Sequence, residues 1–273
     1  MKVFCLIIFL LTIFSFLVTC RPTGFPSWLG ARSGDQVGSM PGAAVVAARE
    51  ISPFLQAMAK TPESKDTAKS VIELPAPGYK GSVPVEEAMK KRRTERNFLP
   101  RSLSKNQLAQ ILWAAQGITE EGGNKRAIPS AGALNPLVIF AVIGQDGVDH
   151  LSAGVYQYLP DYHQLRALSQ GDLRKALAEA SLSQSWMASA PVSIIIAAEY
   201  ARTTGKYGKR GIRYTHMEVG HAAQNIFLQA VALNLGAGIV GAFDDAKVKD
   251  ILDLPPNYDP LLLMPVGYVT SYR

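Results

Sequence analysis

Three guanidinium groups and one hydroxyl fall within the five consecutive residues Arg92-Arg93-Thr94-Glu95-Arg96. Guanidinium groups bind phosphate through forked pairs of N–H donors, so this run predicts a site for a phosphate monoester. A second interpretation is the cationic C-terminal end of a helix, which the helix dipole favours. That interpretation accounts for Arg92 and Arg93 but not for Arg96, which lies beyond the expected end of the helix. On these residues alone, both interpretations remain open.

A loop of small residues, PSAGALNP, spans residues 129–136 directly before an apolar strand pattern. The small side chains of Ala131 and Gly132 would let the backbone approach a planar ligand. Ser130 and Asn135 could hydrogen-bond the edge of such a ligand. Ordinary loop chemistry explains the same residues equally well. The segment is therefore a candidate ligand contact with an open alternative.

Lys206 and Tyr207 lie in the segment 202–213, which holds five cations and no acid. Crowding by like charges disfavours the charged ammonium form of a lysine, and a neutral lysine can act as a base. The alternative is a solvated loop whose cations balance acidic residues elsewhere.

The sequence GAGIVG at residues 236–241 matches the spelling of the dinucleotide-binding glycine motif. That motif must leave a strand and open a helix, so that the helix N-terminus faces a pyrophosphate. Here the glycines follow a long helical pattern instead, which excludes a Rossmann site. They form either a backbone surface near a flat ligand or a tight turn from helix to strand.

We expect no metal site. His216 and His221 are five residues apart on a predicted helix, so their side chains point about 140° apart and share no ligand face. The only cysteines are Cys5 and Cys20, which excludes cysteine ligands and a cysteine nucleophile from the rest of the chain. The chain also lacks a Gly-x-Ser-x-Gly elbow and a P-loop, so it gives no support to serine hydrolase or P-loop chemistry.

The composition is typical of a globular protein, with 48% hydrophobic and 18% charged residues in 273. Positive charge is concentrated in residues 80–105 and 202–213. Neither segment interleaves aromatic side chains for base stacking, so a discrete anionic ligand is favoured over nucleic acid.

The elements that must position these residues alternate between helix and strand, which predicts an α+β domain. Continuous β-branched apolar runs predict two central strands buried on both faces. Capping signals and a 3.6-residue apolar period predict the helices, and the last of these is apolar on nearly all sides after His221, which favours a core or an interface. The expected strands are 138–144, 155–159, 192–198 and 261–269, and the expected helices are 84–93, 104–117, 172–182 and 213–235.

Residues 1–20 are expected to be a targeting segment, because Met1-Lys2 precedes the short apolar run 3–18. Leu17-Val18-Thr19-Cys20 is similar to a bacterial lipoprotein signal, in which Cys20 would carry the lipid; the alternative is an uncleaved N-terminal anchor. Residues 21–70 are rich in proline, glycine and serine and are expected to form a linker. The folded domain is expected at 71–273.

Eight segments taken together resemble the nitroreductase family of flavin enzymes, most closely its SagB/azoline-oxidase-like branch. The resemblance covers residues 72–269 in family order, and it implies a homodimeric α+β fold with a central, mostly antiparallel sheet flanked by helices and a long buried interface helix. The matching segments are IELPAP (72–77), RRTER (92–96), ILWAAQGIT (111–119), PSAGALNPL (129–137), APVSIIIAA (190–198), KYGKRGIRY (206–214), EVGHAAQNIFLQA (218–230) and GAFDD (241–245).

The resemblance also implies FMN at the subunit interface and assigns roles to individual residues. The phosphate, ribityl chain and pyrimidine edge would be held by Arg92, Arg93, Thr94 and Arg96. The ring would be approached from the partner subunit by Ser130, Ala131, Gly132 and Asn135, although Asn135 stands where this branch often has an aromatic residue. Backbone near the reactive flavin nitrogen would come from Val240, Gly241 and Ala242. Lys206 and Tyr207 match the pair that azoline oxidases use as a base.

Three functions follow from this resemblance. The first is an FMN-dependent oxidoreductase that transfers hydride to or from a small organic substrate, with NAD(P)H as a candidate donor. The second is an azoline oxidase that forms thiazoles or oxazoles in a peptide, and the third is a non-enzymatic flavin-binding module. The expected location is the membrane, as an extracytoplasmic or periplasmic lipoprotein or, alternatively, as a cytoplasm-facing protein with an N-terminal anchor.

Overall fold

A computed structural model describes residues 70–120, 122 and 125–270 of the chain. The predicted targeting segment 1–20, with Cys20, and the linker 21–70 apart from its last residue lie outside these described residues. No helix within the described ranges has the length and apolar character needed to cross a membrane.

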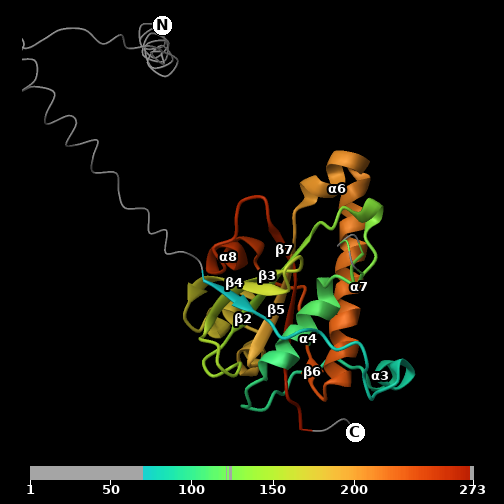
Figure 1. Ribbon diagram of the computed structural model, residues 1–273. Coiled ribbons are helices and arrows are strands. Elements are labelled where there is room, and N and C mark those ends of the chain that lie inside the picture. The colour runs from blue at the N-terminus through green and yellow to red at the C-terminus, as the bar shows by residue number, and fades with distance from the viewer. Residues whose placement is uncertain (1–69, 121, 123–124, 271–273) are drawn as a thin grey trace, which may run out of the picture. The chain divides into compact units, whose positions relative to one another are not determined.

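One antiparallel sheet forms the centre of the domain (Figure 1). Its seven strands follow the order β1-β4-β3-β2-β5-β7-β6. The strands are β1 (Val71–Glu73), β2 (Leu137–Ile143), β3 (Gly154–Leu159), β4 (Gln164–Gln170), β5 (Val192–Ala198), β6 (Gly236–Ala237) and β7 (Asp259–Gly267). The order confirms the predicted α+β class with a mostly antiparallel sheet.

The strands β2 and β5 pair with each other over seven residues, from Leu137 opposite Ala198 to Ile143 opposite Val192. Every residue of both strands is buried. Their continuous β-branched sequences are typical of strands that are covered on both faces, and the prediction of two central strands is confirmed.

Helices cover both faces of this sheet. They are α3 (Val85–Lys91), α4 (Lys105–Gln116), α5 (Arg174–Ala180), α6 (Tyr200–Tyr207), α7 (Arg210–Ala232) and α8 (Asp245–Ile251), with short 3-10 turns at Ala131–Ala133 and Ser185–Ser189. The predicted helix at 104–117 is confirmed with its capping box, in which the Ser104 hydroxyl accepts from the Gln107 N–H at 3.2 Å. The predicted helix at 213–235 is α7, which begins three residues earlier and ends before Gly236.

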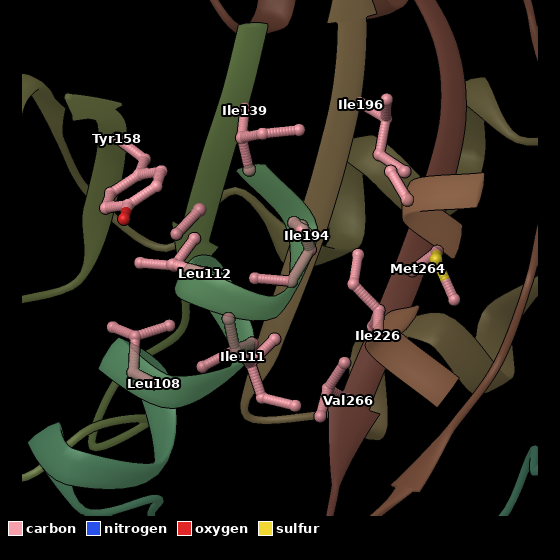
Figure 2. Close-up of a cluster of buried hydrophobic side chains, with 14 of the residues drawn as sticks. Leu108, Ile111, Leu112, Ile139, Tyr158, Ile194, Ile196, Ile226, Met264 and Val266 are labelled. Atoms are coloured by element: carbon pink, nitrogen blue, oxygen red, sulfur yellow. The ribbon is translucent and has the colours of Figure 1, made fainter. Parts of the chain in front are cut away.

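Side chains alternate between the two faces of β5 and divide the core into two layers. Ile194 and Ile196 face α4 and α7, where they pack near Leu112 and Ile226 (Figure 2). Ile195 points to the opposite face and joins the cluster that includes α5 and α8 residues. This packing on both faces holds β2 and β5 in one register and so fixes the positions of the loops at their ends.

Two expectations differ from the structure. The sequence predicts no helix over residues 200–207, but Lys206 and Tyr207 form the C-terminal end of helix α6. The part of α7 after His221 is expected to be apolar on nearly all sides, but Gln224 is exposed there and Asn225 and Gln229 are half-buried, so a polar face remains. Only part of α7 is therefore covered by its own chain.

Candidate functional site

The arginine run lies along the edge strand β6. The helix α3 ends at Lys91, and the chain then continues in extended form. Thr94 forms a parallel bridge with Ala237, and the Glu95 N–H donates to the Ala237 carbonyl at 2.9 Å. These contacts fix the backbone from which the arginine side chains project.

Two of the three arginines lie over aromatic rings. The Arg92 guanidinium carbon is 5.2 Å from the centre of the Phe227 ring, and that of Arg96 is 5.6 Å from the Trp186 ring. A ring beneath a guanidinium holds the cation without using its N–H donors. The structure describes no hydrogen bond or ion pair from either side chain to residues 70–120, 122 or 125–270, so these donors suit an anion such as a phosphate.

Arg93 is engaged differently. Its Nε donates to the Lys91 carbonyl at 3.1 Å and lies 3.9 Å from the Glu95 carboxylate. The structure therefore distinguishes Arg93 from Arg92 and Arg96, whereas the sequence separates only Arg96, by its place beyond the expected end of the helix.

The glycine-rich segment after α7 is a site of close packing. A Cβ at Gly238 would lie 2.6 Å from the Trp186 ring, and one at Gly236 would lie 2.5 Å from Val269 Cγ1. Both glycines are thus needed for β6 to pack against its neighbours. The segment forms the edge of an antiparallel sheet and not the start of a helix, which agrees with the exclusion of a Rossmann site.

The residues after these glycines return to the sheet. Val240 is buried and exchanges two backbone hydrogen bonds with Leu263, at 2.9 and 3.0 Å. Gly241 and Ala242 are exposed, and the Ala242 carbonyl accepts from Gln184 at 3.3 Å. The exposed backbone of this pair is open to a ligand, as the sequence comparison with the family implies.

The loop from Ser130 to Asn135 is held in an unusual conformation. Gly132, Ala133 and Asn135 have φ angles of 62°, 55° and 45°, in the left-handed region that costs energy for residues other than glycine. The Ser130 hydroxyl accepts from the Asn135 N–H at 2.9 Å, and Arg202 donates to the Asn135 carbonyl at 3.0 Å. Such strain persists only where surrounding contacts impose it, and it is frequent at ligand-binding loops.

Glu218 on α7 anchors this loop from beneath. It is 2% exposed, and its Oε1 accepts from the Ala131 N–H at 2.9 Å, with a further hydrogen bond from the Ser130 side chain. Its other oxygen, Oε2, is buried and has no hydrogen-bond partner among the described residues. Burial raises the pKa of Glu218, and these hydrogen bonds oppose part of that shift.

Lys206 and Tyr207 meet the same loop from α6. A Cβ placed on Gly132 would lie 2.6 Å from the Tyr207 hydroxyl and 3.0 Å from Lys206 Nζ. The φ of 62° favours a glycine at position 132, and the ends of the Lys206 and Tyr207 side chains lie close to it. The structure brings together the loop and the Lys206–Tyr207 pair, two features that are far apart in the sequence.

The arginine run is not brought to this loop within one chain. The loop is anchored at Glu218, whereas Arg92 lies over Phe227, nine residues further along α7 and hence about 13 Å away along its axis. Figure 1 shows the same separation, with α3 and α6 at opposite ends of α7. The arginine run and the loop 130–135 thus contact α7 at two different positions along its length.

The two helix histidines do not form a metal site with each other. His216 Nε2 is 2.6 Å from the Tyr200 hydroxyl, and its ring packs edge-on against the tyrosine ring. No group of three or more His, Cys, Asp and Glu side chains with metal-binding geometry occurs in the part of the chain that the structure describes.

Sequence reasoning missed the residues that support the site. Glu218, Phe227, Trp186 and Arg202 act through contacts with segments remote in the sequence. One signal was present for Glu218, because this acid lies next to Val219 and between Thr215 and Ala222 on the face of α7 that is buried. A buried acid at such a position indicates a specific partner.

Replacing Glu218 with glutamine is expected to flatten the pH dependence of stability. Because the folded-state pKa of Glu218 is raised above its ordinary value, its contribution to folding is largest below that value and is lost as the pH rises through the folded-state pKa. Glutamine keeps an acceptor for the Ala131 N–H but does not titrate. Urea unfolding of parent and variant from about pH 4 to pH 8 should show the two free energies converging at low pH.

Glu86→Gln is the matched control, because Glu86 is an exposed carboxylate at the first turn of α3. This control should keep the parental slope. A Glu218→Gln protein whose unfolding free energy parallels that of the parent at every pH would contradict the assigned role of burial.

The sequence matches a known protein family and several of its relatives. The model of the Nitroreductase family matches residues 89–268. The chain is 44% identical over 185 residues to a protein of Methanocaldococcus jannaschii named as a nitroreductase, over 68% of this chain and 91% of the relative. It is 26% identical over 180 residues to the microcin B17-processing protein of Escherichia coli, over 64% of this chain and 66% of the relative.

The fold is shared with a crystal structure from Ralstonia eutropha JMP134 that is also named as a nitroreductase. The TM-score is 0.63 at 24% sequence identity, over 75% of this chain and 92% of the other. The family match covers most of the described domain, and the sheet, the helices and the close relative agree with it. The chain belongs to the nitroreductase family of oxidoreductases and is similar to its microcin-processing members.

Proposed function

We propose that the chain is an FMN-dependent oxidoreductase that acts as a homodimer. When bound, FMN supplies hydride transfer to or from a small organic substrate, and the protein positions the cofactor and substrate. The observation that carries this proposal is the pair of guanidinium groups at Arg92 and Arg96, each of which lies over an aromatic ring and makes no side-chain hydrogen bond or ion pair with the described residues.

The loop 130–135 supports the proposal because its geometry is fixed before any ligand binds. Its hydrogen bonds to Glu218 and Arg202 hold the exposed backbone of Gly132 and Ala133 in place. A preorganised backbone can contact a flat ring system without paying an ordering cost on binding. Lys206 and Tyr207 beside Gly132 would then hold or move a proton at the substrate.

The separation of the two residue groups along α7 supports a homodimer. A two-fold axis that pairs two α7 helices antiparallel would place the Glu218 end of one helix near the Phe227 end of the other. The exposed face of α7 carries the apolar side chains of Ile212 (41% exposed) and Met217 (48% exposed), which such a contact would cover. One complete site would then use residues from both subunits.

The homodimer is a direct prediction. We expect light scattering to give twice the chain mass, and Met217→Arg to shift the protein toward monomer with a parallel loss of bound flavin, because a charge would be buried at the contact. Met89→Arg is the matched control, since Met89 is equally exposed at 56% but lies on α3. A monomeric parent with full flavin occupancy would contradict the prediction.

A second candidate function is azoline oxidation in a peptide. It is favoured by the Lys206–Tyr207 pair at the loop and by the similarity to the microcin B17-processing protein. The non-enzymatic alternative predicts flavin binding without turnover. Attachment to the membrane through Cys20 stays a prediction from the sequence.

The proposal is tested by the visible spectrum of the purified protein, followed by turnover assays. We expect flavin absorbance near an equimolar ratio to chain, and oxidation of NADH or NADPH with a quinone or nitroaromatic acceptor. Activity only on an azoline-containing peptide would select the second candidate. A colourless protein that takes up no added FMN would overturn both enzymatic candidates. A yellow protein that is inactive on every substrate would support the non-enzymatic flavin-binding module.

A further inference from the structure

Gln116 is a buried polar side chain that the fold does not explain. It is the last residue of α4 and is 1% exposed, yet neither its Oε1 nor its Nε2 has a hydrogen-bond partner among the described residues. Leaving an amide buried without hydrogen-bond partners destabilises the folded state. A hydrophobic residue would avoid that cost at the end of α4, so the amide points to a bound group that pairs with it.

Arg126 is adjacent and shares this property. Its Nη2 is 2.8 Å from the Asp161 carboxylate, and its Nη1 is 3.5 Å from the backbone carbonyl of Gln116, so the Arg126 side chain reaches the end of α4. The Arg126 Nε is buried and also has no partner in residues 70–120, 122 and 125–270. One hydrogen-bond acceptor, Gln116 Oε1, and two donors, Gln116 Nε2 and Arg126 Nε, are therefore without partners among the described residues.

Both residues line one cavity of about 210 Å³ at the end of the sheet. Leu137 and Ile139 of β2 form an apolar wall, and Arg166 of β4 and Arg202 of α6 line other sides. Exposed residues such as Arg166 lie on its boundary, so the cavity reaches the surface. At about 30 Å³ per water molecule, the space suits a ligand of only a few heavy atoms.

The charges around the cavity favour a single negative charge. Asp161 pairs with Arg126 at 2.8 Å, and Glu199 pairs with Arg202 at 2.7 Å. The exposed side chain of Arg166 has no hydrogen bond or ion pair with another described residue. One positive charge is therefore left uncompensated at the cavity.

We propose that this cavity binds a small carboxylate that carries a hydroxyl or amino group next to its carboxyl, such as a 2-hydroxy acid. Gln116 Nε2 and Arg126 Nε would donate to the carboxylate, and Gln116 Oε1 would accept from the neighbouring hydroxyl. Arg166 supplies the complementary charge. The ligand thereby satisfies the three unpaired atoms of Gln116 and Arg126.

This site is separate from the one proposed for flavin chemistry. Arg92, Arg96, Lys206 and Tyr207 do not line the cavity, and Asn135 is its only residue from the loop 130–135. Binding of the acid can therefore be measured without flavin or turnover, and its failure would leave the proposed function untouched.

Calorimetric titration of the full-length protein with L-lactate tests the proposal. We expect saturable binding of lactate and binding at least about tenfold weaker for propionate, which lacks the hydroxyl, and for lactamide, which lacks the charge. No saturable heat with lactate would overturn the proposal and indicate a cavity filled by water. Equal binding of all three probes would also overturn it.

Variants distinguish this cavity from surface charge in general. Gln116→Met keeps the side-chain size and removes both unpaired atoms, so it should fold and lose lactate binding by at least about tenfold. Arg166→Met changes an exposed residue and should weaken binding without altering the unfolding midpoint. Arg101→Met is the control, because Arg101 is an exposed arginine that stacks on Tyr268 outside the cavity. Parental affinity in Gln116→Met, or equal loss in Arg101→Met, would contradict the assignment.

Discussion

Alanine at Arg92 or Arg96 is expected to give a protein that purifies with little or no flavin. Each guanidinium lies over an aromatic ring, and its donors have no partner among the described residues, so under the proposed function they would bind the FMN phosphate. A lost hydrogen bond to a charged group costs about 1.5–3 kcal/mol, so the dissociation constant for FMN should rise roughly 10- to 150-fold per substitution. Fluorescence titration of the apoprotein with FMN measures this change directly.

Arg101→Ala is the matched control for this experiment. Arg101 also stacks on an aromatic ring, with its guanidinium carbon 3.9 Å from the centre of Tyr268, but it is outside the run 92–96. It should retain parental affinity for FMN. If the proteins with alanine at Arg92 and at Arg96 are as yellow as the parent, the phosphate site is elsewhere.

Lys206→Ala and Tyr207→Phe are expected to lower turnover at least tenfold while leaving flavin content unchanged. The two side chains meet at the position of Gly132, where the loop presents its exposed backbone. Removal of a group that transfers a proton in the rate-determining step typically costs about 10²- to 10⁴-fold. The measurement is turnover per bound flavin, with an acceptor or peptide that the parent converts.

Lys209→Ala controls for the general effect of removing a cation from this region. Lys209 is exposed and lies between α6 and α7, and the contacts of the Gly132 position do not include it. An equal decrease in turnover with Lys209→Ala would assign the effect to overall charge. Parental turnover in both Lys206→Ala and Tyr207→Phe would remove the pair from the site.

Local sequence patterns predict the elements whose side chains have one consistent environment. The runs VIFAVIG and VSIIIAA gave the strands β2 and β5, because burial on both faces selects apolar β-branched residues at every position. Strand β4, QLRALSQ, was not predicted, because its burial follows no simple alternation. Its strand conformation is imposed by pairing with β3 and β1.

The candidate site divides in the same way. The residue types alone indicated the arginine run, the loop 130–135 and the Lys206–Tyr207 pair. The contacts that support them could not be predicted, because the partners come together only in the folded chain: Phe227 under Arg92, Trp186 under Arg96, and Glu218 beneath Ala131. The cavity around Gln116 is a further example, since it combines α4 with β2, β3 and β4.

The pairing of Thr94 with Ala237 sets an order of events during synthesis of the protein. The edge strand β6 enters the sheet only through β7, which ends at Gly267, close to the C-terminus. Until β7 has been synthesised, β6 has no strand to pair with. The arginine run then lacks the paired β6 that fixes its backbone. Contacts between such distant parts of a sequence form slowly, because a long loop must close first. The backbone that carries Arg92 and Arg96 is therefore fixed late in folding, after β7 has paired, although these residues lie far before β7 in the sequence.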